Sequence, residues 1–159
     1  ISDCLVGSEM CIRDRMCAGD ITVINSNAKF SLTETMVGLT PAQISPYVIK
    51  KAGFTNAKKL MITAERFDGI KAKEYHLADY LFDTDQELQE IEESLEKQIL
   101  NCAPKAIIET KKILDIAYNR IDQDFIEYAS KNFVEQIIDG EGREGILAFI
   151  EKRKPEWKK

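Results

Sequence analysis

The chain has 159 residues, with 22 Lys and Arg against 27 Asp and Glu, which gives a formal net charge of −5. This length predicts one domain or part of one, and the acidic balance argues against a nucleic-acid partner, which needs a basic face. No apolar run is long enough to span a bilayer, and no stretch has the pattern of a signal peptide. The four cysteines and single histidine lack metal-site spacing, so we expect no metal site, no disulfide framework and a cytoplasmic location.

The first fifteen residues differ from the rest of the chain. They show no clear helical or strand periodicity, and Glu9 to Arg15 can be back-translated into a transposon-type sequencing adapter read in frame. We therefore expect residues 1–15 to be a non-native leader and exclude them from fold reasoning. The native sequence is then expected to continue from Met16 within a longer reading frame.

Residues 16–84 are expected to mix short strands with helices. The β-branched stretch Asp20–Asn25 predicts a buried strand. The chain then turns at Ser26-Asn27 and returns as a second short strand, Lys29–Leu32. The elements expected after these are a helix capped by Ser45 that ends at Gly53, a second helix from Asn56 to about Ala64, a short helix opened by Phe67-Asp68 that runs through Tyr75, and a strand-like piece, Ala78–Asp83.

One acid, Glu34, stands alone among apolar and small residues between Ala28 and Tyr47. A carboxylate in such surroundings is costly to desolvate, so we expect its pKa to be raised. General acid–base chemistry near neutral pH needs such a group. The alternative is a first-turn helix acid favoured by the helix dipole, and the residues by themselves favour this alternative.

Residues 85–159 predict a succession of amphipathic helices. Thr84 and Glu87 have the spacing of a capping box, and apolar residues repeat at helical spacing from Leu88 to Cys102. Further helices are expected from Pro104 to about Asn119, from Asp122 to Gly140 with Phe125, Ala129, Phe133 and Ile137 as its inner stripe, and from about Arg143 onward.

The chain resembles the crotonase (enoyl-CoA hydratase/isomerase) superfamily from Met16 to its C-terminus. The matching residues include Asp20, Ala28-Lys-Phe30, Glu34, Gly38, Pro41, Gly53 to Leu60, Arg143-Glu-Gly145 and Phe149-Ile-Glu-Lys-Arg-Lys154. The stretches Phe30-Ser-Leu-Thr-Glu-Thr35 and Ile44-Ser-Pro-Tyr-Val48 look most like the methylglutaconyl-CoA or isohexenylglutaconyl-CoA hydratase branch. The resemblance implies an α/β fold, in which residues 16–84 form the C-terminal part of a ββα spiral core. Residues 85–159 would form a helical oligomerisation region that builds trimers or dimers of trimers.

The resemblance also implies a catalytic role for Glu34. In crotonase hydratases two backbone N–H groups stabilise the thioester enolate, while acidic side chains manage the water and the proton at Cα. Glu34 aligns with the acid usually assigned proton transfer at Cα. The oxyanion-hole donors and the other acid would lie upstream of Met16; Asp14 falls at that acid's position by a gapless count, which we treat as coincidence. We therefore expect the intact parent to be a hydratase and the chain as given to be inactive or nearly so.

Further roles follow only from the resemblance. Pro41, Ala42 and Tyr47 would shape the acyl pocket, and Phe149 with Lys152 would approach the nucleotide end of coenzyme A, which is part of the substrate, so no separate cofactor is expected. A solvated basic helix end is an equal alternative for Lys152. The sole histidine, His76, is expected to cap a helix in a left-handed conformation. Double-bond isomerisation and a non-catalytic assembly module remain alternatives to hydration.

Overall fold

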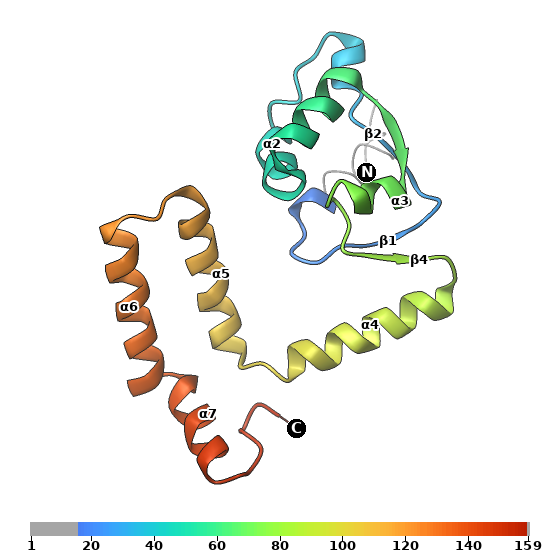
Figure 1. Ribbon diagram of the computed structural model, residues 1–159. Coiled ribbons are helices and arrows are strands. Elements are labelled where there is room, and N and C mark those ends of the chain that lie inside the picture. Colours follow the sequence, from blue (N-terminus) through green and yellow to red (C-terminus); the bar gives the residue numbers. More distant parts are fainter. Residues whose placement is uncertain (1–15, 159) are drawn as a thin grey trace, which may run out of the picture. The chain divides into compact units, whose positions relative to one another are not determined.

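A computed structural model describes residues 16–158 of the chain, which form two compact units (Figure 1). The first unit runs to Ile91 and the second begins at Glu92. The predicted leader, residues 1–15, lies outside the described residues.

Two short sheets frame the first unit. Strand β1 (Val23–Asn25) pairs in parallel with β4 (Tyr80–Phe82), and β2 (Lys29–Ser31) pairs antiparallel with β3 (Arg66–Asp68). The two strands expected on either side of Ser26-Asn27 both form, although each is shorter than predicted, and they do not pair with each other. Each of these strands pairs instead with a strand much later in the sequence, because contacts between distant segments decide which strands pair.

The β2–β3 pairing brings aromatic side chains into contact in the core of the first unit. Phe30 and Phe67 face each other in the register and stack with ring centroids 5.7 Å apart. Tyr75 meets Phe67 edge-on at 5.8 Å. Such pairs add about 0.5–1.5 kcal/mol beyond their burial. Around them lie the largest fully buried side chains of the unit, Leu32, Val48, Leu60 and Leu77.

Two helical elements separate β2 from β3. A short 3-10 helix, η1 (Glu34–Val37), is followed by α2 (Ser45–Thr63). The predicted break at Gly53 is confirmed, since Gly53 has φ 74° and ψ 161° and the chain bends there between two helical halves. The predicted cap is wrong, because Ile44 occupies the N-cap and the Ser45 hydroxyl donates to the Ala42 carbonyl at 3.1 Å instead.

Helix α3 (Gly69–Glu74) forms as the sequence predicted. Its N-cap is Asp68, whose carboxylate accepts a hydrogen bond from the Lys71 N–H at 3.0 Å. After its last residue, His76 has φ 60°, and the Leu77 N–H donates to the Ala72 carbonyl at 2.8 Å. The sole histidine therefore closes a helix in the left-handed conformation.

Helix α4 (Asp85–Leu100) carries the chain across the division between the units. The predicted capping box is confirmed, because the Glu87 N–H donates to the Thr84 hydroxyl at 3.2 Å and the Thr84 N–H donates to the Glu87 carboxylate at 3.4 Å. These reciprocal bonds satisfy N–H groups that the first helical turn leaves without a helical partner.

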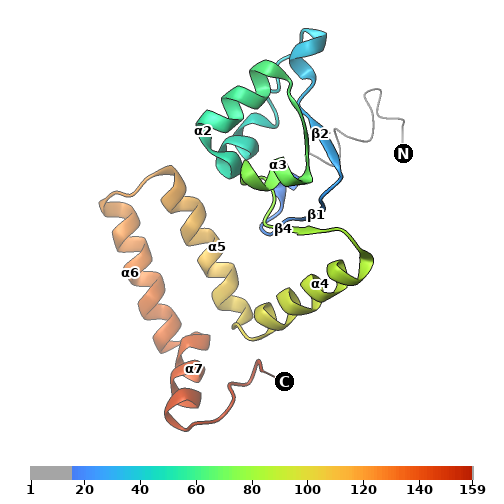
Figure 2. The same cartoon turned by 45° about the vertical axis from the view of Figure 1, so that its right-hand side comes forward.

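The second unit continues with α5 (Pro104–Asn119), α6 (Gln123–Ile138) and α7 (Glu141–Ile150). Figures 1 and 2 show α5 and α6 as an antiparallel pair, with α7 following α6. The Glu141 carboxylate joins α7 to α5 by accepting hydrogen bonds from the N–H groups of Lys105 (2.8 Å) and Ala106 (3.1 Å). The predicted starts at Pro104 and after Asp122 are confirmed, and the Asp122 carboxylate caps α6 through the Phe125 N–H at 2.9 Å.

The inner face of α6 differs from the prediction. Phe133, expected inside, is 68% exposed, whereas its neighbour Asn132 is buried and donates to the Glu109 carboxylate of α5 at 2.9 Å. The inner line of α6 runs from Phe125 and Ala129 through Asn132. Phe133 then falls on the outer face, because consecutive residues of a helix point about 100° apart.

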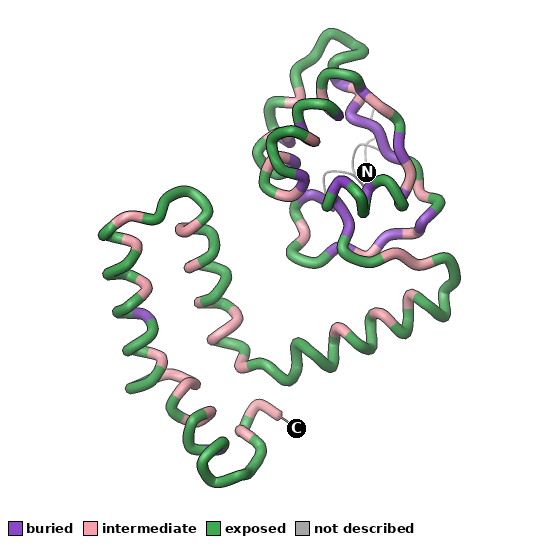
Figure 3. Tube along the Cα trace, in the orientation of Figure 1, coloured by how far each residue is buried: buried purple, intermediate pink, exposed green. Residues whose placement is uncertain are grey.

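The two units differ sharply in how much they bury. Figure 3 shows buried residues concentrated in the first unit, while the second is mostly exposed or intermediate. Helices α4 and α5 contain no buried residue, and α6 and α7 contain one each, Asn132 and Ala148. None of the helices in residues 16–158 has the length and apolar character needed to cross a membrane.

Gly69 tests the packing of α3 against the β1–β2 turn. Its N–H donates to the Ser26 carbonyl at 3.0 Å, and a Cβ at this position would collide with the Asn25 carbonyl oxygen. We expect Gly69→Ala to lower the free energy of unfolding by about 1–3 kcal/mol, because backbone must move. Denaturant titration measures the change. Lys73→Ala, on the exposed surface of α3, is the control and should change it by less than about 0.5 kcal/mol; equal losses in both variants would contradict the close approach.

Candidate active site

Glu34 is the first residue of η1 and is buried, with 8% of its surface exposed. Its backbone carbonyl accepts the Leu39 N–H at 2.9 Å, which closes the turn around Gly38. The carboxylate is thus carried by a short, tightly closed segment between β2 and α2. A buried carboxyl group on such a segment can exchange a proton with a bound reactant at a fixed position.

Two hydroxyl groups fasten this segment to the C-terminal end of α2. The Ser31 hydroxyl donates to the Ala64 carbonyl at 3.1 Å, and the Thr35 hydroxyl donates to the Met61 carbonyl at 3.0 Å. The last carbonyls of a helix have no helical N–H partner, so both bonds satisfy groups that would otherwise need water. One lies before Glu34 in sequence and the other after it, and together they fix the position of η1.

An apolar pocket of about 350 Å³ is lined by Thr35, the residue after Glu34, but not by Glu34 itself. Its walls come from η1, the loop that follows it, and both halves of α2. The lining residues are Thr35, Thr40, Pro41, Ala42, Ser45, Ile49, Phe54, Ala57, Lys58, Met61 and Ile62. The volume is that of a site for a small organic group. Two predicted acyl-pocket residues, Pro41 and Ala42, line it, whereas Tyr47 is half-exposed and does not.

The sequence analysis did not identify Lys58, the one ionisable side chain that residues 16–158 contribute to the lining of this pocket. Its ammonium lies 6.0 Å from the centroid of the Phe54 ring. A signal for it exists in the sequence, since Phe54, Lys58 and Ile62 repeat every four residues along one face of α2. The sequence does not reveal that this face borders the Pro41 loop.

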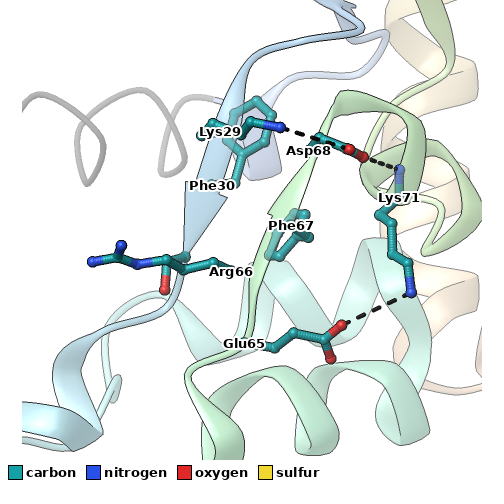
Figure 4. A pocket seen from close by; sticks show the side chains of 8 residues that line it. Lys29, Phe30, Glu65, Arg66, Phe67, Asp68 and Lys71 are labelled. Carbon is teal, nitrogen blue, oxygen red and sulfur yellow. Dashed lines mark hydrogen bonds and ion pairs between the residues drawn. The ribbon is translucent and has the colours of Figure 1, made fainter.

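A second, more polar pocket of about 560 Å³ lies over the β2–β3 pair (Figure 4). Four of its charged side chains form ion pairs: the Lys29 ammonium lies 3.7 Å from the Asp68 carboxylate, and the Lys71 ammonium lies 4.0 Å from the Glu65 carboxylate. Arg66 also lines this pocket. The hydrogen bond from Lys59 lowers the pKa of the Glu65 carboxyl, and the N–H of Lys71 lowers the pKa of Asp68. None of the predicted site residues lines this pocket, and its Lys29–Asp68 ion pair joins β2 to β3.

Phe149 and Lys152 belong to the second unit. Phe149 lies in the last turn of α7 and is 85% exposed, and Lys152 follows with φ 54°. The Lys152 N–H donates to the Phe149 carbonyl at 3.2 Å, so the two residues are held together at one helix end. In residues 16–158 no three His, Cys, Asp or Glu side chains gather closely enough to hold a metal ion.

Comparison with known proteins places these features in a family context. A sequence model described as enoyl-CoA hydratase/isomerase matches residues 15–159. The chain is 28% identical to carnitinyl-CoA dehydratase of Proteus mirabilis, covering 89% of this chain and 56% of that protein. It is 27% identical to the peroxisomal Delta(3,5)-Delta(2,4)-dienoyl-CoA isomerase of Arabidopsis thaliana, covering 92% and 53%.

Solved structures agree with these sequence matches. Pseudomonas aeruginosa AtuE superposes with a TM-score of 0.88 at 35% identity, over 92% of this chain and 57% of that one. An enoyl-CoA hydratase/isomerase from Marinobacter aquaeolei superposes with a TM-score of 0.85 at 30% identity, over 91% and 55%. The chain therefore spans about half the length of the proteins it matches.

The hydrogen bond from the Ser31 hydroxyl to the Ala64 carbonyl can be tested by substitution. We expect Ser31→Ala to lower the free energy of unfolding by about 1–3 kcal/mol, because the buried Ala64 carbonyl loses its donor. Thr35→Ala is the matched comparison. Its hydrogen bond is exposed, so water can replace the donor and the loss should be smaller. Denaturant titration of both variants gives the order, and a larger loss for Thr35→Ala would contradict this assignment.

Proposed function

Because the chain belongs to the enoyl-CoA hydratase/isomerase family and has its crotonase-type α/β fold, we propose that it is the part of an enoyl-CoA hydratase that carries the proton-transfer acid, Glu34. The observation that supports this most strongly is a buried carboxylate on η1, the element that also contributes Thr35 to the lining of an apolar pocket. The proposed reaction adds water across the α,β double bond of an acyl-CoA thioester. In the opposite direction it is a lyase reaction, the elimination of water.

The proposed step balances as follows. The oxygen of water bonds to Cβ of the thioester, and the electrons of the double bond pass through Cα to the thioester oxygen as an enolate. Glu34 supplies the proton that Cα gains, and the proton lost by water restores the acid. Hydrogen-bond donors at the enolate oxygen are essential to this chemistry. Since the chain spans about half the length of its relatives, we assign those donors to the rest of the intact parent and expect the chain by itself to have little or no activity.

We propose a branched, methylglutaconyl-type acyl group as substrate. The stretches Phe30–Thr35 and Ile44–Val48 resemble that branch, and both flank the apolar pocket. In this proposal Pro41 and Ala42 contact the acyl group. Tyr47, which does not line the pocket, contacts the acyl group from outside that lining. No further cofactor takes part, since coenzyme A is part of the substrate, and we propose a cytoplasmic location.

Isomerisation is the second candidate. It needs an acid–base group that moves a proton between carbons beside the thioester, and Glu34 suits this as well as hydration. One relative is named as a dienoyl-CoA isomerase. The two reactions differ in product, because hydration adds one oxygen from solvent and isomerisation adds none. Mass spectrometry of the product formed in ¹⁸O-labelled water separates them.

The second unit supports a homo-oligomer, with a trimer or a dimer of trimers as the proposed state. Its helices leave large apolar side chains exposed, including Phe133, Ile138, Phe149 and Ile150. Large apolar side chains exposed on neighbouring helices favour a protein–protein contact surface. Phe149 and Lys152 would meet the nucleotide end of coenzyme A in this assembly, where a lysine ammonium suits phosphate. A non-catalytic assembly module would show the same self-association but would bind no acyl-CoA.

Replacement of Glu34 by Gln tests the proposed catalysis. We expect Glu34→Gln, in the product of the complete genomic reading frame that contains residues 16–159, to slow hydration of 3-methylglutaconyl-CoA by roughly 10²–10⁴-fold, because the amide cannot transfer the proton. Glu74→Gln on α3 is the control and should keep full activity. An unchanged rate in Glu34→Gln would remove Glu34 from the mechanism.

Replacement of Phe133 by Glu tests the proposed assembly. A charge at this exposed apolar position of α6 cannot be desolvated cheaply, so we expect Phe133→Glu to shift the chain to a smaller species in analytical ultracentrifugation. Ser130→Glu places the same charge on an exposed polar position of the same helix and should leave the assembly intact. Identical sedimentation of Phe133→Glu and wild type would show that this face is not the interface.

A further inference from the structure

From the geometry of the apolar pocket we infer that Lys58 selects acyl groups that end in a carboxylate. This inference rests on the proposed function, because it assumes that the pocket next to Glu34 receives the acyl end of the thioester. It adds a specificity-determining residue that neither the resemblance nor the comparisons assign.

Of the polar side chains that line the pocket, Lys58 is the one best suited to bind an anion. The hydroxyls of Thr35 and Ser45 already donate to backbone carbonyls, at 3.0 Å and 3.1 Å. Thr40 adds an uncharged hydroxyl, and the remaining lining side chains are apolar. Among residues 16–158 no carboxylate lines the pocket, so no acid of this part of the chain competes for the ammonium.

The neighbouring Lys59 differs from Lys58 because its ammonium is already bound to other side chains of the protein. Lys59 forms an ion pair with Glu65 at 2.8 Å and donates to the Tyr75 hydroxyl at 3.0 Å, which raises the pKa of Lys59. Lys58 points about 100° away around the helix, toward the pocket. Among residues 16–158 its ammonium approaches the Phe54 ring and forms no ion pair or hydrogen bond, which leaves its three N–H donors available to a ligand.

A pocket of this composition suits a ligand with an apolar body and one anionic end. The five-carbon chain of a glutaryl or glutaconyl thioester has this form: its thioester end lies toward Glu34 and its distal carboxylate can reach the ammonium. The hydrogen bond between ammonium and carboxylate is charge-assisted. Because the Lys58 side chain is exposed at the edge of the pocket, solvent screening keeps the effect modest.

A phosphate of coenzyme A is the other anion that could reach Lys58. Both sources share the same chemistry, an anionic oxygen that accepts hydrogen bonds from an ammonium. They differ in one respect, since every acyl-CoA carries the phosphates and only dicarboxylic acyl groups carry the distal carboxylate. A pair of ligands that differ only at the acyl end therefore separates them.

The test compares glutaryl-CoA with valeryl-CoA, which have five acyl carbons each and differ in the distal carboxylate. Binding to the full chain is followed by titration calorimetry and by NMR of the methyl groups of Ala42, Ala57 and Met61, which lie in the pocket wall. We expect Lys58→Met to weaken glutaryl-CoA about fivefold and to leave valeryl-CoA unchanged. Lys58→Arg should retain the preference, and added salt should reduce it. Lys73→Met on α3 is the control for removal of a lysine charge.

Each other result overturns the inference in a recognisable way. Equal weakening of both ligands by Lys58→Met would assign the lysine to a coenzyme A phosphate. Binding that leaves the pocket methyl signals unmoved would place the acyl group elsewhere and would leave the proposed hydratase function intact. Absence of binding by either thioester to the wild-type chain would reject both the inference and acyl-CoA binding by this chain.

Discussion

The geometry of the candidate site depends on how the C-terminal end of α2 is completed. A helix leaves its last carbonyls without N–H partners, and here the hydroxyls of Ser31 and Thr35 supply two of the missing donors. The segment that carries these hydroxyls also carries Glu34. The bonds that complete the helix therefore hold the buried carboxylate in place, and they set one wall of the apolar pocket beside it. A local requirement of helix chemistry thus determines where the proposed acid–base group lies.

The two units differ in how they bury apolar side chains. The first gathers a core in which Phe30, Phe67 and Tyr75 pack around fully buried leucines. The second relies on polar links between helices, such as Asn132 with Glu109 and Glu141 with the start of α5, and keeps much of its apolar surface outside. Helices of this kind need further burial to be stable. Self-association, as we propose, would supply it.

We propose that catalysis and substrate selection use different residues of the first unit, Glu34 and Lys58. Hydratases and isomerases of the family can share an acid such as Glu34, because both reactions move a proton beside a thioester. What distinguishes one substrate from another is then the pocket, where apolar walls accept many acyl groups and a single ammonium favours those with a distal anion. We regard Lys58 as the residue through which this pocket would discriminate.

The sequence by itself determined the helix boundaries that depend on local chemistry. The Thr84–Glu87 capping box, the opening of α3 at Phe67-Asp68, Asp122 as a cap, the break at Gly53 and the left-handed His76 all follow from backbone and capping rules that act within a few residues. The tertiary structure alone decided that β1 pairs with β4 rather than β2, that Asn132 rather than Phe133 faces inward, and that Lys58 borders the Pro41 loop. Each of these depends on partners distant in sequence, and periodicity carries no information about such partners.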